Sequence, residues 1–459
     1  MKNTICFVLI LSFYGKYTLQ QVLYTKSVSI RSDDFENIYN TKITNEPNQK
    51  IKNCDSTEEL NLSGMNLKFI PNDIIRSDAI RHVSLANNFL KKIPQNILFH
   101  VTSLSCLNMS RNSLNLYEEN KIHHAYVRVL DLSYQTMVHI NALPELEVFD
   151  EDLRKEKNYE HMIFDSSKMR LPNAEYLDLS GNDISSLNWD FNISFPKLVR
   201  LDLMNINAEE LDPNFFNKIP SSLRILHLED NYLYNLTLEN LAEIASLHLD
   251  GNPIKKLNIK SATLLTLSLA NCTILNEEAV LDTPNLEQLD LSRNNMYNSI
   301  DIFYVNPLNA LRILLLDNNE LSHIPILSNV QWLTELSLSY NMIEYIKPHS
   351  FQYLQFLNKL SLKKNRINRI DKVTFSGLNR LEYLDLSENQ LSYLPTDWTL
   401  PLTNLQYLNL NSNLFGSIGD MGIYSVPSLQ HLFVKNNTFT KITTLELDPF
   451  PDFITVYLY

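Results

Sequence analysis

The sequence predicts an α/β solenoid of about 16 to 17 coils, with a parallel β-sheet on its concave side and a mostly irregular or short-helical convex side. Three observations lead to this fold class. A Leu-x-Leu-x-x-Asn motif recurs, a second set of apolar positions keeps step with it, and from Leu336 onward the motif returns every 24 residues. A chance abundance of leucine would not give equal intervals, so we interpret each interval as one coil.

Each motif explains how its own coil is built. The two leucines face the same side of a strand, and parallel stacking joins them into one core, because no single coil can bury its own leucines. The asparagine can bond the backbone groups left unpaired where the chain turns away from the strand. The predicted structural residues are Asn341, Asn365, Asn389, Asn413 and Asn437, together with Cys272, which occupies the same position in an earlier coil.

The repeats divide the chain into three predicted parts. Residues 1–18 are a predicted signal peptide, residues 19–54 an N-terminal cap segment, and residues 55–459 the repeat domain. An irregular insertion interrupts the register over about residues 139–172. Met162-x-Phe164 lies only 15 residues before Leu177, too few for a full coil, so we expect one degenerate coil that carries a loop.

The first residues are typical of a secretory signal. Lys2 precedes an apolar run over residues 5–14 that is too short to span a bilayer, and a retained signal anchor is the alternative. No later stretch has the length of a membrane helix, so we expect a secreted, extracellular protein with no membrane span. Six glycosylation triplets fit this location, at Asn61, Asn108, Asn192, Asn235, Asn271 and Asn436.

Cysteine is sparse in the predicted mature chain, which retains Cys54, Cys106 and Cys272. Cys54 and Cys106 lie about two coils apart, roughly 10 Å, which exceeds the reach of a disulfide unless the first segment folds back. Both residues are therefore candidates for an interchain disulfide, and inert free thiols are the alternative.

Composition argues against several classes of function. The formal charge is −13, from 39 basic and 52 acidic residues, which argues against non-specific binding to nucleic acid. The motifs of serine hydrolases, zinc proteases, phosphate loops and dinucleotide sites are missing, and only eight glycines are available for such loops. We therefore expect no enzyme activity, no catalytic residue and no cofactor.

The side chains flanking the strand leucines face the concave surface, and in mid-array they are mainly acidic. His227 and His248 hold equivalent positions on neighbouring coils, so their rings should lie about 5 Å apart. Such a pair could bind a metal or respond to pH, because adjacent imidazoles resist double protonation. Without a third soft ligand, we favour a solvated polar strip and expect no metal. The candidate binding residues here are His227, Glu229, Asp230, His248 and Asp250.

Farther along the array, the concave positions become basic and aromatic. Tyrosine is favoured at recognition surfaces for its large, stiff and half-polar contact area. Ordinary packing of rings along a sheet is an equally good explanation. The candidate binding residues in this part are Tyr340, Lys359, Lys363, Tyr383, Tyr407, Phe433 and Lys435.

The C-terminal end contains Phe450, Phe453, Tyr457 and Tyr459 and has no recognisable cap. We expect these apolar side chains to leave the last coil uncovered. Either this end docks on a partner, as a homo- or heterodimer, or the sequence is a truncated product of a longer gene.

Across residues 55–459, the coils and the outer-arc segments at 349–354 and 373–378 resemble extracellular leucine-rich repeat proteins of the typical class. That class includes Toll-type receptor ectodomains and secreted insect immune repeat proteins. The chain departs from the insect group in having no cysteines after the repeats and no coiled coil. The resemblance implies a horseshoe that binds other macromolecules and, by analogy, partners such as complement-like thioester proteins.

These observations together predict a secreted, non-enzymatic protein that binds a protein ligand or co-receptor through its concave face and C-terminal end, in innate immune recognition. The alternative is a cell-adhesion or matrix-organising protein held at a surface by association.

Overall fold

The computed structural model describes residues 58–71, 77–116, 122–135, 169–184, 189–212, 214–239, 241, 243–273, 279–297, 308–423, 426–439, 450–451 and 454–458. The repeats divide into two compact units, an N-terminal unit within Ile43–Asn294 and a C-terminal unit within Asn295–Tyr459. The predicted signal peptide (1–18) and cap segment (19–54) lie outside the described residues. Among the described residues, no helix is both long enough and apolar enough to cross a membrane.

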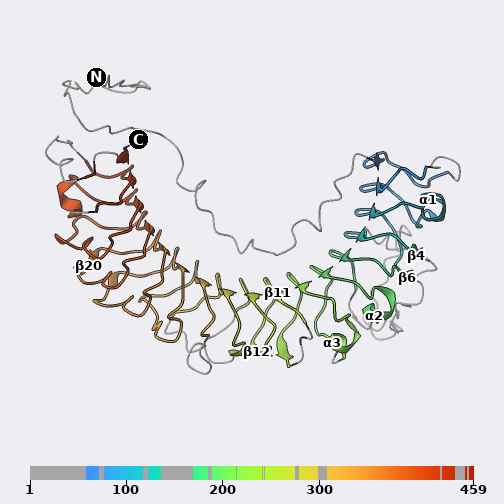
Figure 1. Ribbon diagram of the computed structural model, residues 1–459, viewed down its shortest axis with the longest axis horizontal. Coiled ribbons are helices and arrows are strands. Elements are labelled where there is room, and N and C mark those ends of the chain that lie inside the picture. Colours follow the sequence, from blue (N-terminus) through green and yellow to red (C-terminus); the bar gives the residue numbers. More distant parts are fainter. Residues whose placement is uncertain are drawn as a thin grey trace, which may run out of the picture. The chain divides into compact units, whose positions relative to one another are not determined.

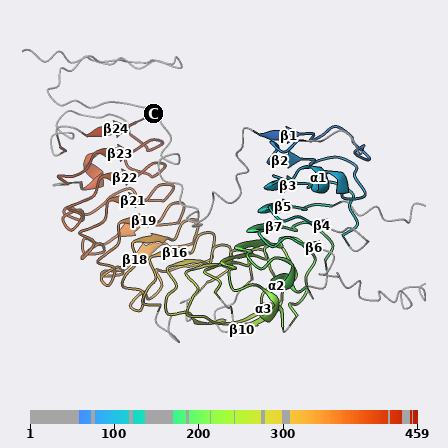
Figure 2. The same cartoon turned by 45° about the vertical axis from the view of Figure 1, so that its right-hand side comes forward.

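The N-terminal unit has a parallel sheet in which each coil contributes one three-residue strand (Figures 1 and 2). The register aligns the central residues, so that Leu177, Leu201, Leu226 and Leu247 follow one another across the sheet. Its strands are β1 (Glu59–Asn61), β2 (His82–Ser84), β3 (Cys106–Asn108), β5 (Val129–Asp131), β7 (Tyr176–Asp178), β8 (Arg200–Asp202), β9 (Ile225–His227), β11 (Ser246–His248), β13 (Thr266–Ser268) and β15 (Gln288–Asp290).

The C-terminal unit repeats this arrangement. Its central residues run in register from Leu336 to Leu432, and Val456 of the last strand extends the 24-residue period by one further coil. The strands are β16 (Ile313–Leu315), β17 (Glu335–Ser337), β19 (Lys359–Ser361), β21 (Tyr383–Asp385), β22 (Tyr407–Asn409), β23 (His431–Phe433) and β24 (Thr455–Tyr457). The described strands of the two units, ten and seven, make 17, so the predicted solenoid of 16 to 17 coils is confirmed.

The insertion adds no strand to this sheet. β5 pairs directly with β7, with Val129 opposite Tyr176 and Leu130 opposite Leu177. Two hydrogen-bonded neighbours leave no room for a strand between them, which agrees with the expectation that Met162-x-Phe164 is not a full coil of its own. Met162 and Phe164 themselves lie outside the described residues.

The opposite side of each unit carries short elements joined by irregular chain, as predicted. In the N-terminal unit, the ring of Phe191 packs beneath this side with its centroid 5.5–6.3 Å from those of Trp189, Phe195 and Phe215. The elements are α1 (Gln95–His100), α2 (Phe191–Ser194), α3 (Phe215–Lys218), η5 (Gly419–Met421) and small parallel sheets of β4 (Ile122–His123) with β6 (Met169–Arg170), β10 (Asn235–Leu238) with β12 (Lys256–Lys260) and β14 (Ala279–Asp282), and β18 (Tyr345–Ile346) with β20 (Arg369–Ile370).

The motif asparagines connect neighbouring coils. Asn365 donates from Nδ2 to the carbonyl of Leu362 in its own coil (3.1 Å) and to that of Leu338 in the preceding coil (2.9 Å). Its Oδ1 accepts from the backbone N–H of Ile343 (3.1 Å). The same bonds are made by Asn341, Asn389, Asn413 and Asn437. Each side chain thus satisfies backbone groups that would otherwise be buried without partners.

The residue before each asparagine position adopts a left-handed backbone in coil after coil. Gly181 and Gly251 fill it in two coils, at φ of 68° and 72°, whereas Tyr340, Lys364 and Glu388 fill it in three successive coils at 58°, 53° and 54°. This conformation places the three long side chains at the edge where the chain leaves the strands. We call that edge the exit edge.

The apolar residues at the C-terminal end are covered rather than exposed. Phe450 and Tyr457 are each 4% exposed, and Tyr457 is buried because β24 pairs with β23 and its ring stacks on that of Phe433. The expected uncovered end is therefore wrong for these two residues. Phe453 and Tyr459 lie outside the described residues, and docking of this end on a partner stays a prediction.

Of the cysteines, Cys106 differs from expectation and Cys272 agrees with it. Cys106 is disulfide-bonded, and its partner lies outside the described residues, so its sulfur is not available for the interchain bridge that its separation from Cys54 suggested. Cys272 is free and buried, and its Sγ contacts the carbonyl of Leu249 at 3.2 Å. It thus replaces one of the asparagine bonds between coils.

Candidate binding face

The candidate site of each unit lies on the strand face, which we define as the side chains that flank the central leucine of each strand and face away from the core. Strand geometry places the first and third residue of each strand on this side. In-register parallel pairing then puts equivalent residues next to each other on neighbouring coils. The predicted site residues that lie on the strands are therefore brought into ladders.

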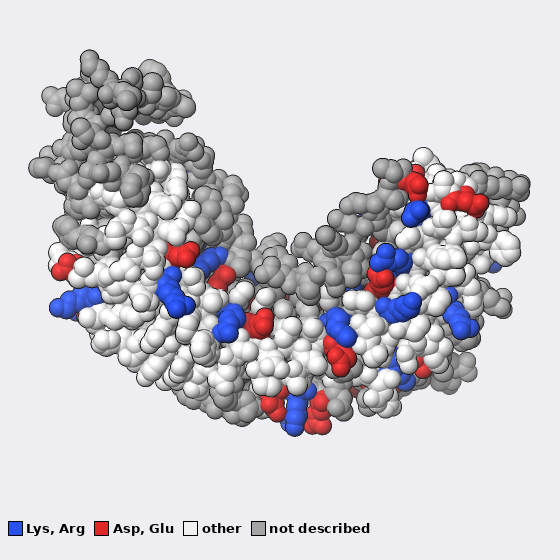
Figure 3. Space-filling view, viewed as in Figure 1, with Lys and Arg blue, Asp and Glu red and all other residues white. Residues whose placement is uncertain are grey.

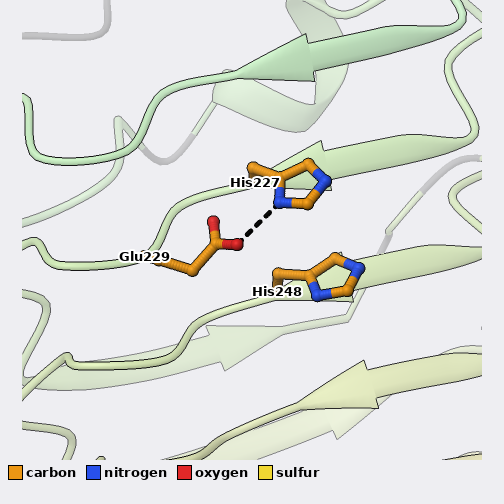
Figure 4. Close-up of side chains that lie close together, drawn as sticks. All are labelled: His227, Glu229 and His248. Atoms are coloured by element: carbon orange, nitrogen blue, oxygen red, sulfur yellow. Dashed lines mark hydrogen bonds and ion pairs between the residues drawn. The ribbon is translucent and has the colours of Figure 1, made fainter. Parts of the chain in front are cut away.

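His227 and His248 are register partners on β9 and β11. Their rings are stacked, with centroids 4.3 Å apart and planes 7° from parallel. Nδ1 of His227 lies 2.6 Å from Oε1 of Glu229, and Nε2 of His248 lies 2.9 Å from Oγ of Ser246. Figure 4 shows the Glu229 carboxylate beside the His227 ring, with the His248 ring nearly parallel below it. These three residues form a compact cluster, which we call the His–Glu cluster.

A charged network adjoins the His–Glu cluster on the preceding coils. Asp202 of β8 lies 4.0 Å from Nε2 of His227 and forms an ion pair with Arg200, at 2.8 Å between Nε and Oδ1. The hydroxyl of Tyr176 donates to Asp202 (2.8 Å) and to Asp178 (3.0 Å). Burial, followed by the negative charge of Asp202, raises the pKa of Asp178 above its usual value. The guanidinium of Arg200 therefore pairs with Asp202, and the hydroxyl of Tyr176 links Asp202 to Asp178.

On the next coil Asp250 occupies the position equivalent to Glu229. Its Oδ1 accepts from Oγ of Ser268 (2.6 Å) and from the backbone N–H of Ala270 (2.7 Å). Burial nevertheless raises the pKa of Asp250 to about 6. Asp230, by contrast, is exposed at the exit edge.

The interpretation of this region as a solvated polar strip is wrong. His227 and His248 are only 5% and 6% exposed, and Asp202 is fully buried. The sequence pattern could not reveal this, because burial depends on contacts between coils, such as those of Tyr176 and Arg200 with Asp202 and the stacking of His227 on His248. The strip is a polar layer over the sheet rather than a row of solvated charges.

The aromatic residues of the C-terminal unit mainly pack against each other. Tyr407 stacks on His431 at 4.7 Å, and Phe433 stacks on Tyr457 at 4.1 Å between centroids. Tyr383, Phe433 and Tyr457 are 7%, 1% and 4% exposed. Their ring faces are occupied, so lateral packing describes these three residues better than an open recognition surface does.

The exit edge of the C-terminal unit offers accessible groups. Tyr340 is 39% exposed, and Nζ of Lys364 lies 4.8 Å from its ring centroid. Glu388 pairs with both Lys364 (3.9 Å) and Lys363 (3.4 Å). We call Tyr340, Lys364 and Glu388 the exit-edge cluster. Lys359 pairs with Glu335 at 3.0 Å farther inside the face, and the backbone N–H of Lys435 donates to Asn411.

A second ladder on the C-terminal unit was missed by the sequence analysis. Trp332 and Phe356 stack at 4.6 Å, Arg312 lies over the Trp332 ring at 5.5 Å, and Arg380 lies over the Phe356 ring at 4.7 Å. Trp332, Phe356 and Arg380 are 24 residues apart, so the repeat interval was the signal that could have found them. They precede β17, β19 and β21 and lie where the chain enters the strands.

The glycosylation triplets differ in accessibility. Asn108 is half-buried, and its Oδ1 accepts from both the backbone N–H and Oγ of Ser110. The remaining five, Asn61, Asn192, Asn235, Asn271 and Asn436, are exposed. Figure 3 shows Lys and Arg interspersed with Asp and Glu over the described part of its face, rather than gathered in a patch of one sign.

Comparisons with known sequences agree with this geometry. Two family models, described as "Leucine Rich Repeat" and "Leucine rich repeat", match residues 332–354 and 355–415. Fibromodulin from Sus scrofa is 33% identical over 136 residues, which are 28% of this chain and 92% of that sequence. The chain belongs to the leucine-rich repeat family.

Longer relatives of this leucine-rich repeat protein include podocan from Mus musculus, 27% identical over 352 residues, 64% of this chain and 57% of podocan. Toll-like receptor 9 from Mus musculus is 27% identical over 182 residues, 38% of this chain and 15% of the receptor. The predicted resemblance to Toll-type proteins is therefore confirmed. The chain spans little more than half the length of its podocan relative.

A solved structure has the same fold. The leucine-rich repeat protein LIC12759 of Leptospira interrogans superposes with a TM-score of 0.54 at 21% identity, over 85% of this chain and 92% of that one. At this level of identity the likeness shows the fold alone.

Proposed function

We propose that this leucine-rich repeat protein is secreted and non-enzymatic, and that it binds a protein ligand through its strand face and the adjoining exit edge in innate immune recognition. The observation that carries the proposal is the exit-edge cluster. An exposed tyrosine flanked by a lysine and a glutamate, all held on stacked coils, combines a stiff aromatic anchor with charges of both signs. Aromatic anchors of this kind contribute most of the energy in many protein interfaces.

Three further observations support parts of this proposal. Similarity to Toll-like receptor 9 supports a role in recognition. The apolar run after Lys2 and the exposed glycosylation triplets support secretion. The mixed charges of the described surface favour a protein ligand over a polyanion such as nucleic acid.

The proposal can be tested by affinity capture. The full-length glycosylated protein would be immobilised and exposed to extracellular fluid of its source, as wild type and as the double variant Tyr340→Ala, Lys364→Ala. We expect the wild type to retain a defined protein and the variant to retain at least tenfold less, which corresponds to about 1.4 kcal/mol or more.

The matched control is the double variant Tyr353→Ala, Lys372→Ala in the same unit. Tyr353 and Lys372 are exposed on the outer arcs, so their loss should leave capture unchanged. Equal capture by both double variants would contradict binding at the exit edge. Capture of insoluble matrix or cell-surface material in place of one soluble protein would favour the adhesion and matrix-organising alternative.

A further inference from the structure

We propose that the His–Glu cluster is a zinc site, with His227, Glu229 and His248 as its ligands. One nitrogen from each imidazole and one oxygen of the carboxylate all lie within 4.8 Å of one another, on two hydrogen-bonded strands and the turn after the first. Two imidazoles and a carboxylate form a donor set that Zn²⁺ uses, with a fourth position left open for water or for a side chain of a partner.

The atoms in and around the His–Glu cluster favour the binding of a cation. The second carboxylate oxygen of Glu229 is shielded from solvent and has no hydrogen-bond partner among the described residues. A buried oxygen of this kind costs free energy unless a donor or a cation reaches it. Asp202 lies behind His227, at 4.0 Å from Nε2, and Ser246 fixes Nε2 of His248. The hydroxyl of Ser246, hydrogen-bonded to the ring of His248, can orient that histidine as a ligand, whereas Asp202 is too far from His227 for a hydrogen bond and contributes negative charge.

Zinc binding requires small and specific rearrangements. Ligand atoms around a tetrahedral Zn²⁺ are separated by about 3.3 Å, given bond lengths near 2.0 Å. The 2.6 Å contact between His227 and Glu229 must therefore lengthen as the metal replaces the shared proton. The two rings are nearly parallel, so one must turn about its outer torsion for both lone pairs to meet at the metal, and that torsion is soft in histidine.

The donor set also selects among metals. Ca²⁺ requires six or more oxygen ligands, and Mg²⁺ prefers oxygen ligands and retains its waters, so neither ion should compete at micromolar concentration. The local charge favours cations in general, because Glu229, Asp202 and Asp178 are opposed among these neighbours by Arg200 alone. The selectivity for Zn²⁺ over Ca²⁺ and Mg²⁺ therefore comes from the two imidazole nitrogens.

The test is a zinc titration of the full-length protein after removal of metal with a chelator, followed by calorimetry. We expect one Zn²⁺ per chain at micromolar affinity or better, and no heat from Ca²⁺ at the same concentration. His248→Ala and Glu229→Gln should each weaken binding at least tenfold. The matched control is His323→Ala, which removes an exposed histidine of the C-terminal unit and should change nothing.

Glu229→Gln keeps the size of the side chain, so it decides the outcome if His248→Ala fails to fold. X-ray absorption of the zinc-loaded wild type should show two imidazole nitrogens and oxygen in the first shell. Binding only at millimolar zinc, equal affinity in wild type and Glu229→Gln, or a first shell without imidazole would each overturn the proposal.

Discussion

At the scale of single residues, the asparagine of each coil does more for stability than its small size suggests. Asn365 satisfies two carbonyls and one N–H that belong to two different coils, all in a buried setting. Removing a side chain that pairs buried backbone groups leaves each of them without a partner. The asparagine ladder therefore stabilises the contact between coils in addition to the leucine core.

Asn365→Ala should lower the free energy of unfolding by about 3 kcal/mol, because three buried hydrogen bonds are lost together. Chemical denaturation measured by circular dichroism checks this value. The control is Asn368→Ala in the same coil, whose exposed side chain should contribute less than about 0.5 kcal/mol. Similar losses in the two variants would refute the ladder as a stabilising element.

Asp250 gives the molecule a pH dependence of defined sign. Its pKa in the folded protein is about 6, against 3.8 for an ordinary aspartate, because burial disfavours the charged carboxylate. Between pH 4 and 6 the folded state therefore binds more protons than the unfolded state, and stability falls as pH rises through this window. The loss amounts to about 3 kcal/mol at most.

Melting temperatures measured between pH 4 and 7 test whether stability falls as pH rises. The wild type should lose stability over the window, whereas Asp250→Asn should lose clearly less, since an amide does not titrate. Asp230→Asn, at the exposed neighbouring position, serves as the control and should follow the wild type. A steeper decline in Asp250→Asn than in wild type would show that the carboxyl is not held neutral by burial.

At the scale of elements, the strand-entry ladder shows how side chains of successive coils stabilise one edge of the sheet. Arg312, Trp332, Phe356 and Arg380 form one continuous stack. Aromatic stacking contributes about 0.5–1.5 kcal/mol, and each exposed cation–π contact about 0.5–1 kcal/mol. Trp332 takes part in both kinds of contact.

Trp332→Ala should therefore destabilise the protein by about 2 kcal/mol, although the side chain is 46% exposed. Tyr353→Ala, with the same exposure and no stacked partner in the described structure, should cost well under 1 kcal/mol. The comparison is made by thermal unfolding of both variants. Equal shifts would mean that the ladder adds no stability beyond ordinary surface contacts.

The positions of the strands were largely predictable from the sequence, whereas the burial of their side chains was not. The 24-residue period located β17 to β23, and register alone placed His227 next to His248. Burial of the His–Glu cluster and of Phe433 depends on the side chains of neighbouring coils. A single repeat motif contains no information about those side chains. The 15-residue spacing from Met162 to Leu177 argued against a full coil in the insertion, and the direct pairing of β5 with β7 agrees with that argument.

At the scale of the whole molecule, each coil depends on its neighbours, as expected for repeat proteins. A chain ending at Phe439 would lack β24 and would remove Tyr457 from the face of Phe433. Hydrogen–deuterium exchange should then show lost protection in β23 and less loss in β22, with β7 and β8 unchanged. Uniform loss over all coils, or no loss at β23, would contradict the nearest-neighbour account.

The central claim is that the strand side of the coils, rather than their outer arcs, binds a protein. The most direct measurement introduces a photo-crosslinking residue at position 340, 364 or 388 and, for comparison, at the outer positions 353 and 372, followed by exposure to extracellular fluid. We expect the same protein to be crosslinked from all three exit-edge positions and from neither outer position. Crosslinks from the outer positions alone would contradict the claim.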